Sequence, residues 1–135
     1  MRSFFKKLTL SFSAGCLGGL INSLVVFLFG AFDITAMFGV NIAPSLTPPW
    51  LYQRIVWGGI WGVLFLFPVF KRSYTSRGLL LSLAPTIVQL FIVFPIKAQK
   101  GLLGFELGLL TPLFVVFFNA VWGLTTAYWL KFVGR

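Results

Sequence analysis

The sequence predicts an all-α integral membrane protein with four transmembrane helices. The chain of 135 residues is 59% hydrophobic and only 10% charged, whereas a soluble domain carries about a quarter charged residues. Its apolar segments are continuous and close to the ~20 residues that a helix needs to cross the hydrocarbon core. They do not alternate as the strands of a transmembrane β-barrel do. The length indicates a single domain, residues 1–135.

The first predicted span covers residues 8–30. The basic start MRSFFKK followed by an apolar run is similar to a signal peptide, and SAGC, which ends at Cys16, is similar to a lipoprotein cleavage site. The apolar segment before Cys16 is short, however, and the chain stays apolar after it. We therefore expect the first span to remain uncleaved.

The other predicted spans cover residues 48–70, 78–95 and 112–132. The second and fourth are each preceded by a Thr-Pro pair, in LTPP and LTPL. Threonine is a good N-cap, and proline is well suited to the first helical position because the N–H it lacks would have no intrahelical partner there. We expect Thr47 and Thr111 to cap these two helices at the outer surface.

The basic residues predict that both termini are cytoplasmic. The N-terminus, the segment after the second span and the C-terminus together carry Arg2, Lys6, Lys7, Lys71, Arg72, Arg77, Lys131 and Arg135. The other side carries only Lys97 and Lys100. Because cytoplasmic loops are enriched in Lys and Arg, the basic side is the inner side of a bacterial inner membrane.

Several residues recur at a spacing of 64 or 65: LTP at 46 and 110, VWG at 56 and 121, and the basic pairs at 6 and 71. This spacing favours a two-helix hairpin repeated in tandem with both copies in one orientation. Most aligned positions differ, and chance matches are common in a chain rich in Phe and Leu. Between the spans, residues 31–47 are expected to form an ordered outer loop. Residues 96–110 are apolar enough to lie in the interface or to dip into it.

Small and polar residues give each predicted helix one face suited to a protein neighbour, because helices in lipid associate through close packing and interhelical hydrogen bonds. The first helix carries such a face at Ser11, Gly15, Gly18, Gly19 and Asn22. The remaining three carry Gly58 and Gly62, then Ser82, Thr86 and Gln89, and finally Asn119, Gly123 and Thr126.

One polar side chain from each predicted helix is expected at a similar depth in the membrane. These side chains form a common polar layer of Asn22, Arg54, Gln89 and Asn119. At 1.5 Å per residue, each lies roughly 9 to 12 Å below the outer end of its own helix. The layer has two interpretations. It either forms a hydrogen-bonded set that fixes helix register, or lines a pocket in which Arg54 binds an anionic group.

Arg54 is the costliest residue in this layer, since an arginine at the centre of a span is unfavourable by about 2.5 to 3.5 kcal/mol. Three environments would accommodate it: the outer headgroups reached by snorkelling, an ion pair with Asp33 or Glu106, the only two acids in the chain, or a ligand. Trp50, Trp57 and Trp61 follow the same helical ridge. Trp50 or Trp57 is expected to contact Arg54 through a cation–π interaction. Trp61 is expected to pack inside the protein. The alternative is that these tryptophans enclose a cofactor.

The composition contains few side chains that could act in catalysis or bind a cofactor. The chain has no His, a single Cys and two acids, so we expect no metal, no haem and no enzymatic activity. We also expect no nucleic-acid partner despite the net charge of +9, because the basic clusters follow membrane topology. Anionic lipid headgroups near the inner loops are the expected partners, together with a second copy of the chain or a larger membrane protein.

The functional expectation is therefore an accessory or assembly component of a membrane complex. The alternative is a small oligomeric channel or carrier that uses the layer around Arg54 for an anion or a small polar solute. A third, weaker interpretation is a protein that binds lipid headgroups.

Overall fold

The computed structural model describes residues 2–67 and 73–133, and these residues form helices without any strand. Three helical segments are long and apolar enough to cross a membrane: Arg2–Ala31, Tyr74–Lys97 and Thr111–Phe132. They confirm a helical membrane protein. They also match the first, third and fourth predicted spans with shifted ends, since the first starts within the basic N-terminal residues and the third runs two residues beyond Pro95.

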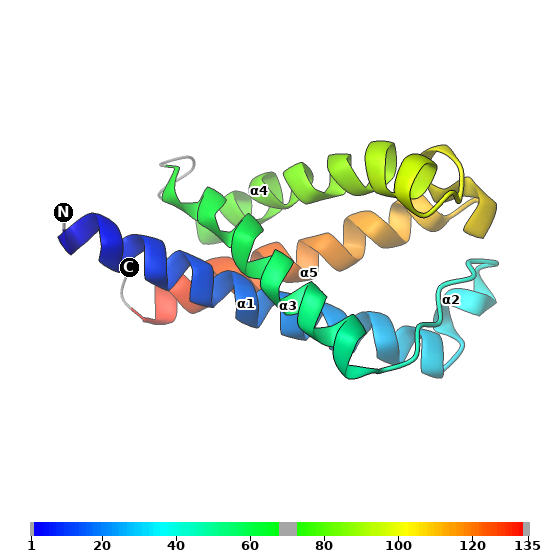
Figure 1. The fold of residues 1–135 in the computed structure, drawn as a ribbon, viewed down its shortest axis with the longest axis horizontal. Helices are drawn as coiled ribbons and strands as arrows, with labels where there is room; N and C mark the ends of the chain where they lie inside the picture. The colour runs from blue at the N-terminus through cyan, green and yellow to red at the C-terminus, as the bar shows by residue number, and fades with distance from the viewer. Residues whose placement is uncertain (1, 68–72, 134–135) are drawn as a thin grey trace.

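The chain follows the order α1 (Arg2–Ala31), α2 (Ile34–Met37), α3 (Pro48–Gly62), η1 (Val63–Leu66), α4 (Tyr74–Val88), η2 (Gln89–Lys97), η3 (Leu102–Leu107) and α5 (Thr111–Phe132). The start of α1, the end of α5 and the start of α4 lie at one end of the molecule, whereas α2 and the connection before α5 lie at the other (Figure 1). The basic residues of the described chain ends, Arg2, Lys6, Lys7, Arg77 and Lys131, belong to the first of these ends.

The second predicted span, residues 48–70, is shorter as an α-helix than expected. Helix α3 ends at Gly62, the backbone continues as the 3₁₀ turn η1, and Phe67 is extended, with φ −71° and ψ 134°. A residue that precedes a proline is driven out of the helical region, and Pro68 follows Phe67 in the sequence. Residues 68–70 of this predicted span, like Lys71, Arg72 and Arg135, lie outside the described residues.

The two predicted helix starts differ in detail. Helix α3 begins at Pro48 after an extended Thr47, as expected, but the Thr47 side chain makes no capping hydrogen bond. The expected N-cap Thr111 is instead the first residue of α5, with Leu110 at the cap. Its hydroxyl is buried without a hydrogen-bond partner, so in both cases the proline at the first turn accounts for the start better than the threonine does.

Glycines bring α1 and α3 into close contact. A Cβ on Gly58 would lie 2.7 Å from the carbonyl oxygen of Gly15, and one on Gly62 would lie 2.5 Å from that of Ser11. The predicted faces are buried here: Ser11, Gly15, Gly18, Gly19 and Asn22 on α1, and Gly58 and Gly62 on α3. The small-residue face thus allows the helix backbones to touch, as expected for association in lipid.

The same kind of contact joins α4 to α5, where Gly78 packs on Gly123. The pair α1–α3 is joined to the pair α4–α5 through α1 and α5, which pack along their lengths. At this junction Trp122 of α5 is 4% exposed, and its indole nitrogen lies 3.2 Å and 3.3 Å from the carbonyl oxygens of Gly15 and Gly58. A single side chain of α5 therefore caps the α1–α3 crossing.

The loop between α1 and α3 and the loop between η2 and α5 are ordered and touch one another. Residues 31–47 contain α2, and Thr35 is buried and donates a hydrogen bond to the carbonyl of Ile42. The backbone N–H of Asn41 donates to the carbonyl of Leu107 at 2.7 Å. Gly108, with φ +150°, lies against Gly39, where a side chain would collide with the backbone. These contacts join the loop between α1 and α3 to the loop between η2 and α5.

Candidate functional site

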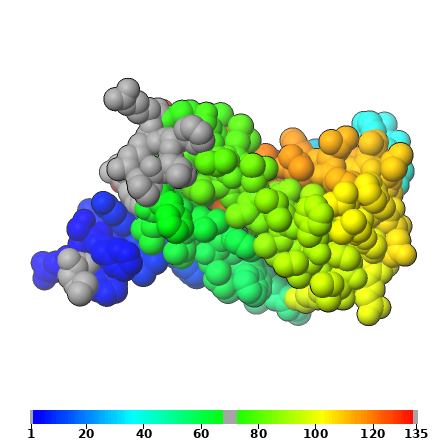
Figure 2. Space-filling model, turned by 90° about the horizontal axis from the view of Figure 1, so that it is seen from above, coloured from blue at the N-terminus to red at the C-terminus, as the bar shows by residue number. Residues whose placement is uncertain are grey.

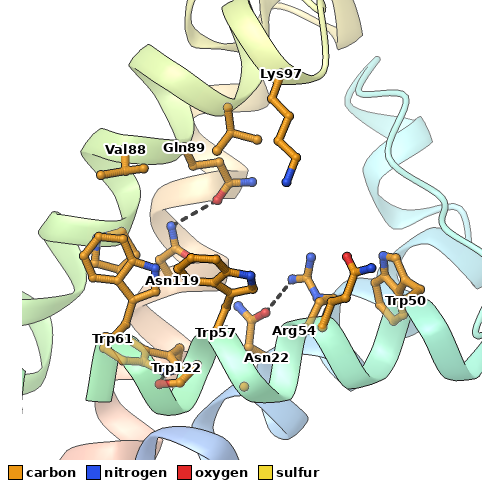
Figure 3. A pocket seen from close by; sticks show the side chains of 15 residues that line it. Asn22, Trp50, Arg54, Trp57, Trp61, Val88, Gln89, Lys97, Asn119 and Trp122 are labelled. Atoms are coloured by element: carbon orange, nitrogen blue, oxygen red, sulfur yellow. Dashed lines mark hydrogen bonds between the residues drawn. The ribbon is translucent and has the colours of Figure 1, made fainter. Parts of the chain in front are cut away.

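A cavity of about 470 Å³ lies between α3 on one side and α4 with η2 on the other. Its floor is formed by α1 and α5, which contribute Gly19, Asn22, Asn119 and Trp122. Figure 3 shows the side chains that converge on it. All four residues of the predicted polar layer and all three predicted aromatic residues line this one cavity: Asn22, Arg54, Gln89, Asn119, Trp50, Trp57 and Trp61.

Helix α3 presents Arg54 to the cavity, and two side chains of α1 anchor it. The Arg54 Nε donates to Ser23 Oγ at 2.9 Å, and its Nη2 donates to Asn22 Oδ1 at 2.6 Å. The guanidinium carbon also lies 4.8 Å from the centre of the Trp50 ring, within cation–π range. The expected cation–π contact is thus made by Trp50.

The polar partners of Arg54 belong to α1 and are themselves held in place. Ser23 Oγ donates to the carbonyl of Gly19 at 2.6 Å, and Asn22 Nδ2 donates to the carbonyl of Phe118 in α5 at 2.5 Å. The two hydrogen bonds of Arg54 use two of the five N–H donors of a guanidinium. Arg54 also lines the cavity, as do Trp57 and Gln53.

On the opposite wall, Gln89 and Asn119 form the second half of the layer. Asn119 Nδ2 lies 3.0 Å from Thr86 Oγ1 and 3.3 Å from Gln89 Oε1, linking α5 to α4 and η2. The predicted layer therefore divides into two hydrogen-bonded groups, one around Arg54 and one around Asn119, which face each other across the cavity (Figure 3).

Lys97 adds a second positive charge that the sequence argument had assigned to the outer loop. It is the last residue of η2, a π-helical segment, and its side chain extends toward the cavity (Figure 3). The line of Pro85, Gln89, Val93 and Lys97, spaced by four residues, forms this wall. π-Helical turns are rare and are frequent at functional sites.

The two acids lie away from this cavity. Asp33 precedes α2 and lines a separate shallow depression with residues of the outer loop, and Glu106 lies in η3 against Gly101. Of the 15 residues that line the central cavity, two are cationic and none is acidic. Within the described part of the chain, neither acid forms an ion pair with Arg54, whose partners are the neutral Ser23 and Asn22.

The aromatic residues divide into two roles. Trp61 is partly buried and packs against the core cluster around Phe65 and Trp122, as expected. Trp57 is 55% exposed at the cavity edge. Sequence reasoning missed Ser23, Lys97 and Trp122. Ser23 directly follows the chosen Asn22, and Trp122 follows Trp57 at the repeat spacing of 65, so signals for these two were present.

The arrangement can bind an anion, since a guanidinium fork, an ammonium group and amide N–H donors surround one space. No group of three or more His, Cys, Asp or Glu residues that would hold a metal occurs in residues 2–67 and 73–133. Comparison of the chain with protein-family models, with curated proteins and with solved structures found no match.

Proposed function

We propose that this protein binds an anionic ligand in the cavity between α3 and η2 and acts as a small membrane carrier for it. The single observation that carries this proposal is the pairing of Arg54 and Lys97 at a cavity lined by no acid. Charges within a membrane are costly unless they are paired. A bound anion would supply the missing negative charge.

The positions of the hydrogen bonds favour binding over a purely structural role for Arg54. A register-fixing arginine would be expected to direct all its donors to protein partners. Here Ser23 and Asn22 hold the guanidinium from one side, and its other side borders a cavity of about 470 Å³. An accessory role in a larger complex, or self-association, stays a prediction.

For the membrane topology, we propose that α3 and η1 together form a fourth span and that both chain ends are cytoplasmic. The 19 residues Pro48 to Leu66 are close to the ~20 needed. The basic end of the molecule then faces the cytoplasm of a bacterial inner membrane. In this orientation the cavity, with Lys97 near its mouth, opens toward the outer side.

A binding measurement tests the proposed function. The protein is reconstituted in zwitterionic nanodiscs and titrated with chloride, inorganic phosphate, acetate and dodecyl phosphate, with tryptophan fluorescence as the readout. Binding of at least one anion is expected to change the fluorescence, because Trp50 lies against Arg54 and three other tryptophans line the same cavity. The variants Arg54→Leu and Arg54→Lys should weaken that binding, the second by losing the bidentate fork.

Lys100→Gln is the matched control, because it removes a positive charge of the same outer segment that does not line the cavity. It should bind as the unmodified protein does. If no anion in the series binds, or if Arg54→Leu binds as well as Lys100→Gln while both remain folded by circular dichroism, the proposal is wrong.

A further inference from the structure

The two walls of the cavity, α3 on one side and α4 with η2 on the other, pack little against each other. Extended packing joins α1 to α3, α4 to α5 and α1 to α5, but among the described residues no comparable interface joins α3 to α4. Viewed from the α4 side, α4 and η2 occupy the middle of the face and α3 emerges along its edge (Figure 2). In a membrane, an opening between two helices faces the acyl chains of lipids.

The gap between α3 and η2 is bordered by Trp57, whose counterpart in the repeated sequence pattern is Trp122. Trp122 of α5 inserts at the α1–α3 crossing, against Gly15 and Gly58. Its counterpart at a spacing of 65 is Trp57, and the same spacing relates Gly15 to Leu80 and Gly58 to Gly123. Trp57 does not fill a matching crossing, because it lines the cavity and is 55% exposed. The two halves of the chain therefore differ at this gap.

The cavity lining combines charged, amide and apolar side chains. Arg54 and Lys97 provide positive charge, and Gln89 and Asn119 provide amide groups. Asn22 and Gln53 add two more amides, and most of the remaining lining is apolar, with Trp61, Pro85, Val88 and Val93 among it. A small hydrated anion would use the charged part alone. A molecule with an anionic head and an apolar chain would use both parts.

From this geometry we infer that the ligand is a lipid with a phosphomonoester headgroup, which enters between α3 and η2 with its headgroup at Arg54 and Lys97. This inference rests on the proposed function and names its ligand class. A phosphomonoester carries a charge of about −1.5 to −2 near neutral pH, which matches one guanidinium and one ammonium group. Its oxygens also accept bidentate hydrogen bonds from arginine.

Native mass spectrometry of the purified protein tests the ligand class. Phosphatidic acid, phosphatidylcholine of the same chain length and inorganic phosphate are added in separate arms. We expect phosphatidic acid to bind in preference to the other two. Lys97→Gln should weaken its binding about tenfold, the loss of one charge-assisted hydrogen bond, whereas Lys100→Gln should not.

A second pair of variants tests the sideways entry. Val88 borders the gap, so Val88→Trp should obstruct an acyl chain while leaving the charged groups in place. Val116→Trp is the matched control, because Val116 is 43% exposed on α5 and does not line the cavity. Circular dichroism and gel filtration establish that both variants fold. Phosphatidic acid should be lost from Val88→Trp and retained by Val116→Trp.

The outcomes separate the two proposals. Binding of inorganic phosphate that requires Arg54, without binding of phosphatidic acid, overturns the lipid inference and leaves the proposed function intact. Phosphatidic acid that binds Arg54→Leu, Lys97→Gln and Lys100→Gln equally overturns both. A lipid-free dimer as the dominant species would show that a second copy closes the gap, and would also overturn the lipid inference. Unchanged binding to Val88→Trp overturns sideways entry.

Discussion

Asn22 accepts a hydrogen bond of 2.6 Å from Arg54 and donates one of 2.5 Å to the carbonyl of Phe118. One amide side chain of α1 therefore connects α3 to α5. Both of its polar atoms are used, and it is buried. Asn22 is thus the residue through which the position of Arg54 depends on the packing of the other helices.

Replacing Asn22 by Leu should destabilise the protein by about 1 to 3 kcal/mol, because the Phe118 carbonyl and one Arg54 donor lose their partner in a buried setting. The measurement is unfolding of the detergent-solubilised protein followed by circular dichroism. Gln53→Leu is the control, since Gln53 lines the same cavity but is exposed. Equal stability of the two variants would contradict a structural role for the Asn22 hydrogen bonds.

Replacing Asn22 by Asp should abolish anion binding. A carboxylate at the position of Asn22 Oδ1 would lie within hydrogen-bond distance of Arg54 and neutralise the charge that a ligand would otherwise use. We expect affinity for the best anion to fall at least about tenfold, or 1.4 kcal/mol. Anion titrations in nanodiscs measure this. Undiminished affinity in a folded Asn22→Asp variant would mean that the anion does not bind at Arg54.

Gly58→Ala should disrupt the α1–α3 contact. The added methyl group would lie 2.7 Å from the Gly15 carbonyl oxygen and 2.9 Å from the Cα of Gly19, so the two backbones must separate. Overpacking of this kind typically costs about 1 to 3 kcal/mol. Thermal unfolding of Gly58→Ala is compared with that of Ser13→Ala, a change at an exposed position of α1. Similar melting temperatures would argue against close backbone packing.

Trp122→Phe and Trp57→Phe should differ in stability although the two tryptophans occupy equivalent positions of the repeated pattern. Trp122 is 4% exposed and its indole nitrogen contacts two backbone carbonyls, whereas Trp57 is 55% exposed. We expect a loss of about 1 to 2 kcal/mol for Trp122→Phe, because the indole hydrogen bond is lost and the smaller ring leaves buried space. Trp57→Phe should change stability by less than about 0.5 kcal/mol. Chemical denaturation of both variants provides the comparison.

Reporter fusions test the proposed orientation. A reporter enzyme that is active only in the periplasm should be inactive when fused after Arg135 and active when inserted after Gly39, in the outer loop. The expectation follows from the eight basic residues on the inner side. Activity of the fusion after Arg135 would reverse the orientation and place the cavity mouth toward the cytoplasm.

Much of the helix packing followed from sequence, because small and polar residues in apolar helices have few uses other than contact with protein. The predicted face of α1 is buried, and Asn22, Arg54, Gln89 and Asn119 lie around one space. Counting residues at a uniform rise placed them at similar depths because α1 and η2 end, and α3 and α5 begin, near the same end of the molecule.

The position of Lys97 was not predictable in the same way. Hydropathy marked residues 96–110 as a loop, and the 100° periodicity used for faces does not apply to a π-helix. The length of α3 was also missed, because hydropathy does not register the change from α to 3₁₀ geometry before Phe67. Both errors concern backbone winding, about which an apolar run carries little information.

The π-helical winding of η2 has a consequence for the charge of the cavity. An α-helix turns by 100° per residue, whereas i→i+5 hydrogen bonding gives about 82°. Over the eight steps from Gln89 to Lys97, the difference accumulates to about 145°. If η2 were rewound as an α-helix with Gln89 held by Asn119, Lys97 would move from about 64° on one side of Gln89 to about 80° on the other. Its ammonium group would then approach the cavity from the opposite flank of η2. The direction from which the second positive charge reaches an anion is therefore set by how the backbone is wound, without any exchange of rotamers.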